Sequence, residues 1–332
     1  MDTILSKTTI RELGCATVPY CQHSLDAKPL QQRFCKKQVS GGQMKQLVPQ
    51  VAAIHDLSGF GRASLTVVIP ILSSMGMQVC PLPTAVLSTH SGFDDYHFVD
   101  LTAHLQPIID HWKKLDLTFD AIYSGFLGST AQIDIVIDFI KTFSHPGLLV
   151  VVDPVMGDDG ALYGPLDISI VAEMRRLVAH ADIITPNCTE VALLLDEPYR
   201  EKIPKNQLKE VINRLHAMGP RTVIITSVLQ DDPRKTAVVA HSVDDDRFWI
   251  VECDYIPASF PGTGDAFTSV IVGSLLQNDS LPVALDRAVH FTSLGIRAAF
   301  GHKGMAKNGI LLERVLDTLK APVQMSSYQL LD

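Results

Sequence analysis

Short apolar, β-branched runs alternate along the chain with longer segments in which apolar residues recur every three or four positions. The first pattern is typical of buried strands and the second of amphipathic helices. The patterns predict strands at 51–54, 78–83, 121–124, 148–152, 183–185, 222–226, 236–240 and 248–251, and helices at 62–75, 101–115, 131–143, 169–180, 190–195, 205–218, 266–276, 282–299 and 310–319. This alternation indicates an α/β fold in which helices cover both faces of a mostly parallel central sheet. The strands at 236–240 and 248–251 are close in sequence and are expected to form an antiparallel pair.

The first 46 residues differ from the rest of the chain. They lack sustained periodicity and end in a Ser-Gly-Gly break at 40–42. We expect either a disordered extension or translation from an upstream start codon, with Met44 the true beginning. No linker interrupts the pattern after Val51, so we expect one domain over 47–322 and a C-terminal tail over 323–332.

Composition narrows the class of protein. The chain has 332 residues, 46% of them hydrophobic, and a formal net charge of -8, which argues against nucleic acid or an anionic membrane as partner. No apolar run reaches membrane-spanning length. The six cysteines are scattered without a C-x-x-C pair, a pattern typical of free thiols in a reducing compartment. We therefore expect a cytoplasmic protein.

In folds of this kind ligands bind beyond the carboxyl ends of the parallel strands. Polar and acidic residues follow several of the predicted strands and are candidates for one shared site. They are Asp56 and Ser58 after the first strand, Thr84, Ser88 and His90 after the second, Asp153 and Asp158 after the strand at 148–152, Asn187 and Glu190 after 183–185, and Thr226 and Ser227 at the end of 222–226. Two carboxylates such as Asp153 and Asp158 can help hold Mg²⁺ through water. Asn187 and Glu190 have an alternative interpretation as a helix-capping pair.

The most informative segment is Gly262-Thr263-Gly264-Asp265, which opens a predicted helix. Unpaired backbone N–H groups and the helix dipole make such a turn an anion site. An aspartate there repels phosphate, which favours a base that takes the proton of an alcohol during phosphoryl transfer. The alternative is that Asp265 only caps the helix. There is no G-x-x-x-x-G-K-[ST] motif, and the 59–64 loop lacks the third glycine of a dinucleotide fingerprint.

Taken together, these motifs resemble the ribokinase superfamily, and more closely its pyridoxal/pyridoxamine kinase and hydroxymethylpyrimidine kinase branch. The resemblance covers about 51–319. It is carried by G-T-G-D at 262–265, D-P-V-M-G at 153–157, N-x-x-E at 187–190, the Asp-Leu-Ser-Gly-Phe-Gly loop at 56–61, Pro-Leu-Pro-Thr at 81–84 and Tyr-Ser-Gly-Phe-Leu-Gly-Ser at 123–129. It implies a ribokinase-like three-layer fold, a homodimer, and ATP-dependent phosphorylation of the 5'-hydroxymethyl group of a B6 vitamer with Mg²⁺ and a monovalent cation such as K⁺.

The resemblance also implies roles for individual residues. Asp265 would be the base, and the backbone amides of 262–264 would hold the phosphoryl oxygens. The remaining candidates divide into vitamer-binding residues (Asp56, Ser58, Thr84, Ser88, His90), nucleotide-binding residues (Asp153, Asn187, Glu190, Thr226, Ser227) and metal-binding residues (Asp153, Asp158, Glu190).

Two departures from the family pattern keep alternatives open. Asp56 stands where many pyridoxal kinases carry serine, and Phe126 stands where tyrosine is usual. Hydroxymethylpyrimidine therefore remains an alternative substrate. A non-catalytic vitamin-binding protein on the same fold is a further alternative, although such a protein has no need of a base.

Overall fold

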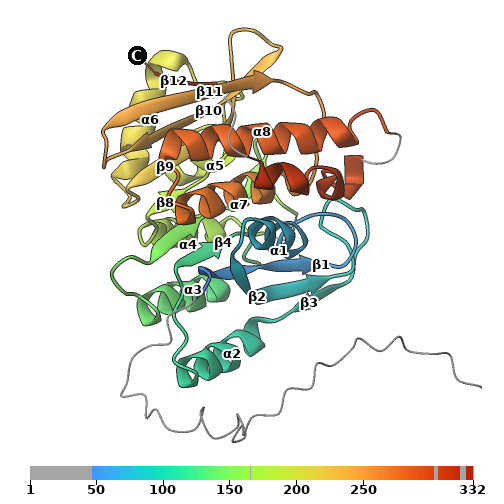
Figure 1. Ribbon diagram of the computed structural model, residues 1–332, viewed down its shortest axis with the longest axis vertical. Coiled ribbons are helices and arrows are strands. Elements are labelled where there is room, and N and C mark those ends of the chain that lie inside the picture. Colours follow the sequence, from blue (N-terminus) through green and yellow to red (C-terminus); the bar gives the residue numbers. More distant parts are fainter. Residues whose placement is uncertain (1–46, 165, 303–305, 322–326, 332) are drawn as a thin grey trace, which may run out of the picture. The chain divides into compact units, whose positions relative to one another are not determined.

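The computed structural model describes residues 47–331 except 165, 303–305 and 322–326. A ten-stranded sheet runs through this part of the chain in the order β12-β11-β10-β9-β8-β5-β4-β1-β2-β3 (Figure 1). Its strands are β1 (Gln50–Ser58), β2 (Gln78–Leu87), β3 (Phe98–Asp100), β4 (Ala121–Ser124), β5 (Leu149–Val152), β8 (Ile183–Ile184), β9 (Thr222–Leu229), β10 (Lys235–Ser242), β11 (Arg247–Asp254) and β12 (Tyr328–Leu330). The six strands from β9 to β2 pair in parallel, and the outer strands are antiparallel.

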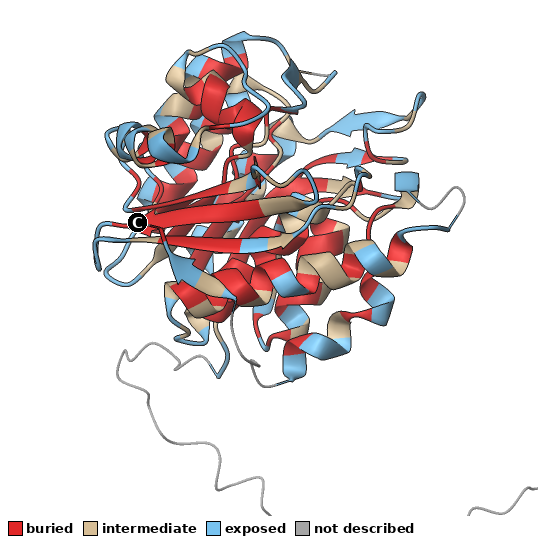
Figure 2. Ribbon diagram, turned by 90° about the horizontal axis from the view of Figure 1, so that it is seen from above, coloured by how far each residue is buried: buried red, intermediate tan, exposed pale blue. Residues whose placement is uncertain are grey.

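Helices cover both faces of this sheet and make the three layers. One face carries α1 (Leu65–Ser74), α7 (Thr263–Leu276) and α8 (Leu281–Ala299). The other carries α2 (Thr102–Lys114), α3 (Thr130–Thr142), α4 (Ser169–Val178), α5 (Cys188–Leu195) and α6 (Lys205–His216). Strand residues are mostly buried, whereas the outward faces of the helices are exposed (Figure 2). The expected three-layer α/β/α architecture is thus confirmed, as is the antiparallel pairing of β10 with β11.

Alternating residues of the central strands face opposite helical layers. Val51 and Ala53 of β1 pack with α7 and α8, whereas Ala52 and Ile54 pack on the other side. Parallel strands buried on both faces read as continuous apolar runs, which is why the sequence pattern located them. Among the described residues, no helix is long and apolar enough to cross a membrane.

Two expectations about boundaries need correction. The segment 310–319 is not an α-helix but contains two 3-10 turns, Leu312–Arg314 and Leu316–Lys320. Its buried residues Leu312, Val315 and Leu319 are spaced by three or four, and a 3-10 turn places i and i+3 on one face as an α-helix does. β1 and β2 are also longer than expected, so Asp56, Ser58 and Thr84 lie within strands instead of loops.

The predicted N-terminal extension, including Met44, lies outside the described residues. At the other end, β12 falls in the segment expected to be a tail, yet it pairs with β11 through Trp249–Leu330 and neighbouring positions. A short hairpin, β6 (Gly157–Asp158) with β7 (Ala161–Leu162), also had no counterpart in the sequence prediction.

Candidate active site

One polar side chain from each of four adjacent strands faces the start of α7. Alternate residues of a strand face the same side, so His55 lies on the α7 side of the sheet with Val51 and Ala53. By the same alternation, the α7 side also carries Tyr123 in β4, Asp153 after β5 and Thr185 after β8. All four are buried. Because parallel strands end at the same edge of the sheet, these side chains form a polar floor beneath the first turn of α7.

The first turn of α7 begins at Gly262, whose φ is 79°. A Cβ at this position would lie 2.3 Å from the backbone oxygen of Arg62, so only glycine allows the turn and the loop before α1 to approach so closely. Among the described residues, no acceptor takes a hydrogen bond from the backbone N–H of Thr263, Gly264 or Asp265. These donors are free for an anion.

Asp265 lies in that turn at the edge of the buried floor, with 14% of its side chain exposed. Its Oδ2 accepts a hydrogen bond of 2.8 Å from the backbone N–H of Ser64. Burial and the nearby Asp56 carboxylate raise the pKa of Asp265 to about 6, although the Ser64 bond opposes this rise. A carboxylate with a pKa near neutral is well suited to accept a proton.

Asp153 and Glu190 lie deeper in the same anionic cluster. Burial, and then the charge of Asp265, raise the pKa of Asp153 to about 8, and the hydroxyl of Thr185 opposes the rise. Burial and the charge of Asp153 likewise raise the pKa of Glu190. Among the described residues, no lysine or arginine pairs with any of these carboxylates. A cluster of this kind is complementary to a cation, and its oxygen donors suit Mg²⁺.

Asn187 and Glu190 form the capping box that the sequence left as an alternative. The Asn187 side chain accepts from the Glu190 N–H at 2.9 Å, and Glu190 accepts from the Asn187 N–H at 2.9 Å. The other Glu190 oxygen accepts from the Met156 N–H at 3.2 Å, and the Asn187 amide donates to Gly157. The pair therefore ties α5 to the 153–157 loop, and a direct metal role for Glu190 stays a prediction.

The predicted metal-binding residue Asp158 and the predicted nucleotide-binding residues Thr226 and Ser227 lie nearer the surface. Asp158 is exposed in β6, and partial burial raises its pKa. Thr226 and Ser227 lie inside β9, where Ser227 has a φ of 59° and is exposed. A positive φ at a serine is uncommon and is found often at binding sites.

Asp56 is buried in β1 and is held by two serines. Ser64 donates its hydroxyl to Oδ1, and Ser58 donates to Oδ2 at 3.3 Å. Burial raises the pKa of Asp56, and the two hydroxyls act in the opposite direction. Ser64 thus links both carboxylates, through its hydroxyl to Asp56 and its N–H to Asp265, and it adopts a strained φ of 55°.

The remaining vitamer-binding candidates are largely engaged within the protein. Thr84 donates to the Phe126 carbonyl at 3.3 Å. The Ser88 hydroxyl accepts from the His97 N–H at 2.8 Å. His90 accepts from the Gly92 N–H at 3.1 Å, so its other nitrogen donates to the Lys307 carbonyl at 2.6 Å. Both ring nitrogens of His90 are therefore engaged within the protein, and the Phe93 ring packs against it.

Sequence reasoning missed three residues of the site: His55, Ser64 and Tyr123. His55 and Tyr123 are fully buried, and neither side chain makes a hydrogen bond of ordinary geometry among the described residues. The available signal was strand parity, because each is a polar residue on the α7 face of an otherwise apolar strand. Ser64 carried no signal, since its role depends on a left-handed backbone conformation.

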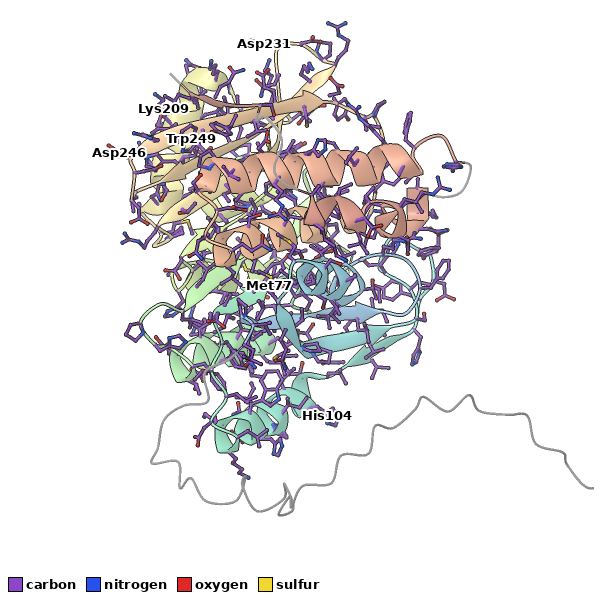
Figure 3. The ribbon with its side chains drawn as sticks, in the orientation of Figure 1. Met77, His104, Lys209, Asp231, Asp246 and Trp249 are labelled. Carbon is purple, nitrogen blue, oxygen red and sulfur yellow. The ribbon has the colours of Figure 1, made fainter. Side chains whose placement is uncertain are left out.

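Among the described residues, no group of three or more His, Cys, Asp or Glu side chains is arranged to hold a metal ion. The histidines that recur every seven residues from His90 do not gather, since His104 is exposed on α2 (Figure 3) while His90 is buried. A bound metal would therefore need ligands from a substrate, as Mg²⁺ takes them from nucleotide phosphates.

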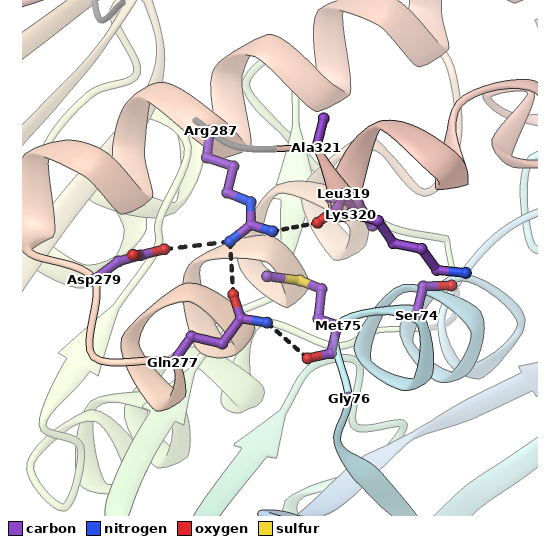
Figure 4. A pocket seen from close by; sticks show the side chains of 9 residues that line it. All are labelled: Ser74, Met75, Gly76, Gln277, Asp279, Arg287, Leu319, Lys320 and Ala321. Carbon is purple, nitrogen blue, oxygen red and sulfur yellow. Dashed lines mark hydrogen bonds and ion pairs between the residues drawn. The ribbon is translucent and has the colours of Figure 1, made fainter. Parts of the chain in front are cut away.

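A hollow of about 550 Å³ lies at the opposite end of α7 (Figure 4). Arg287 fills part of it, donating to Gln277 at 2.7 Å and to Asp279 at 3.2 Å, while Gln277 donates to the Met75 carbonyl. Since α7 has 14 residues, the hollow is about 20 Å from Asp265. It plays no part in the polar site.

Comparison with known proteins gives a consistent result. The family model for phosphomethylpyrimidine kinase matches residues 73–309. Pyridoxal kinase from Ovis aries is 30% identical over 66% of this chain and 75% of its own length. A phosphomethylpyrimidine kinase-like protein from Bacteroides thetaiotaomicron, crystallised with pyridoxal, is 57% identical over 85% of this chain and 99% of its own, with a TM-score of 0.83. Pyridoxal kinase from Lactobacillus plantarum is 31% identical over 82% and 97%, with a TM-score of 0.74.

Proposed function

Because this chain belongs to the phosphomethylpyrimidine kinase family, we propose that it phosphorylates the 5'-hydroxymethyl group of a B6 vitamer with ATP, as a pyridoxal kinase. The observation that carries the proposal is the position of Asp265, a carboxylate of raised pKa beside free backbone donors at the start of α7. The pyridoxal kinases among its relatives and the pyridoxal-bound crystal form support the choice of substrate.

Asp265 orients the vitamer alcohol and accepts its proton as the new O–P bond forms. The pKa of about 6 leaves the carboxylate mostly ionised at pH 7 and still basic enough to take the proton late in the transfer. The Ser64 N–H donates to Oδ2 of the carboxylate, which helps to hold the side chain in place for the alcohol.

The free N–H groups of Thr263, Gly264 and Asp265 bind the oxygens of the transferred phosphoryl group. Donors that are already oriented stabilise charge in the transition state without reorganisation. Gly264 is exposed, and an added Cβ would lie 3.6 Å from the Asp153 Oδ2. The three free N–H groups therefore lie close to the Asp153 carboxylate.

Mg²⁺ would neutralise the phosphate charges and keep the nucleotide in line with the alcohol. Asp153 and Glu190 fit it because they are buried carboxylates without a cationic partner among the described residues. Asp158 is exposed in β6, and we expect it to act on the metal through water. Thr226 and Ser227, at the next strand, would contact the nucleotide, and a monovalent cation such as K⁺ is a further family expectation.

We also propose a homodimer in the cytosol. Exposed apolar side chains at the β2–β3 edge, Val86, Phe98 and Val99, support an interface there. The three described cysteines, Cys80, Cys188 and Cys253, are free, as expected of thiols in a reducing compartment. Size-exclusion chromatography with light scattering tests the dimer, and a Val99→Asp variant should shift it toward monomer.

The experiment that tests the function is ATP consumption with pyridoxal, pyridoxamine, pyridoxine and hydroxymethylpyrimidine side by side. Product mass identifies the phosphate ester. We expect turnover with at least one B6 vitamer. Hydroxymethylpyrimidine is the competing substrate because Asp56 stands where many pyridoxal kinases carry serine. A preference for it would make the protein a hydroxymethylpyrimidine kinase of thiamine synthesis. Vitamer binding without turnover would indicate a non-catalytic protein.

A further inference from the structure

His55 is the buried polar residue nearest to Asp265 that the mechanism above does not use. Its Nδ1 lies 3.8 Å from the Asp265 Oδ1, and its side chain is fully buried. Neither ring nitrogen makes a hydrogen bond of ordinary geometry among the described residues, although the Tyr123 backbone lies close enough to act on the ring. A buried polar group without a partner is costly, so a histidine here calls for an explanation that an apolar core residue would not.

The ring has a dedicated space in the floor of the site. Tyr123 packs edge-on against it, with ring centroids 4.4 Å apart and an interplanar angle of 78°. On another side, Gly125 leaves a gap, because a Cβ there would lie 2.3 Å from the His55 Nδ1. The neighbouring strand thus fixes the ring plane and admits it only because residue 125 is glycine.

The two side chains do not form an ordinary ion pair. Burial lowers the pKa of His55 to about 3, although the Tyr123 backbone opposes this shift, whereas burial raises the pKa of Asp265 to about 6. At neutral pH the imidazole is therefore neutral and Asp265 is the stronger base. His55 cannot relieve Asp265 of its proton, and it is left with the role of a hydrogen-bond donor.

We propose that His55 is a positioning residue whose neutral imidazole, in the Nδ1–H form, donates to the Asp265 Oδ1 when the first turn of α7 closes on bound substrates. The Ser64 N–H already holds Oδ2, so the carboxylate then has one fixed donor on each oxygen. A carboxylate held at both oxygens cannot rotate, and its remaining lone pairs face the alcohol. The inference rests on the proposed kinase function.

Kinetics of His55→Phe and His55→Gln test the proposal. Phenylalanine keeps a ring in the space but removes the donor, and we expect kcat to fall about 10- to 100-fold with KM for ATP unchanged. Glutamine restores an N–H donor and should recover most of the lost kcat. The matched control is His241→Phe, the same change at a buried strand histidine of β10, which should leave kcat unchanged.

The tautomer of the wild-type protein gives a second measurement that does not depend on the variants folding. In ¹⁵N NMR spectra of the complex with vitamer and a non-hydrolysable ATP analogue, we expect a neutral His55 with its proton on Nδ1. A proton on Nε2, or a kcat for His55→Phe equal to that of wild type, overturns the proposal. Absence of vitamer phosphorylation by the wild type would instead overturn the kinase assignment itself.

Discussion

Acidification from pH 7 to pH 5 should suppress vitamer phosphorylation by protonating Asp265. Its pKa of about 6 follows chiefly from burial, with a further upward contribution from the Asp56 charge. For a single titration at that value, the reactive carboxylate makes up about 90% of the enzyme at pH 7, half at pH 6 and about 10% at pH 5. We therefore expect kcat/KM for the vitamer to fall about tenfold between pH 7 and pH 5.

The assay is ADP release at fixed free Mg²⁺ and saturating ATP, with circular dichroism confirming that the protein stays folded. Asp56→Asn provides the internal comparison. Removing that charge lowers the pKa of Asp265, so the acidic limb should move to lower pH even if the vitamer binds less tightly. A profile that is flat from pH 5 to pH 7, or a limb that Asp56→Asn moves upward, would refute the electrostatic account.

Three further substitutions test the first turn of α7 and the buried carboxylates beneath it. Gly262→Ala places a Cβ 2.3 Å from the Arg62 oxygen, in a left-handed conformation that alone costs about 1–2 kcal/mol. We therefore expect both Tm and kcat to fall. Gly264→Ala makes only an ordinary 3.6 Å contact and should keep the Tm in the same thermal melts. Equal melting of the two variants would contradict this contrast. Asp153 has a folded-state pKa raised to about 8, so the folded protein binds more protons than the unfolded chain and its stability falls as pH rises from about 4 to 8. Asp153→Asn should therefore raise the ligand-free Tm at pH 8, and less so at pH 5, while abolishing activity. An unchanged Tm at pH 8 would show that the buried Asp153 charge does not destabilise the folded protein.

Much of the fold could be predicted because the central strands are buried on both faces and flanked by helices of clear periodicity. The wrong or missing elements lie where the spacing of apolar residues does not distinguish one structure from another. The apolar spacing of Leu312, Val315 and Leu319 fits a 3-10 turn as well as an α-helix, and β3 and β12 are three residues long. β3 is an antiparallel partner of β2 that is too short to show a period, and β12 pairs with β11, which is far away in sequence.

The site shows the same division. Asp265, Asp153 and Glu190 each follow a strand or open a helix, which made them candidates, and in the structure their charges act on one another's pKa. Their roles in the reaction stay predictions. The engagement of His90 by Gly92 and Lys307 could not be foreseen, because it depends on a loop more than 200 residues away. His55 was not among the predicted site residues, although it directly follows the strand predicted at 51–54. In the structure β1 continues to Ser58, and strand alternation places His55 on the α7 face.

Turnover of Asp265→Asn, measured as formation of the vitamer 5'-phosphate, tests the proposed chemistry most directly. Loss of a general base typically costs about 10²- to 10⁴-fold, and asparagine keeps the size of the side chain and the Ser64 hydrogen bond. We expect kcat to fall within that range while the Kd for ATP changes little. A folded variant with near wild-type turnover would contradict the assignment of Asp265 as the base.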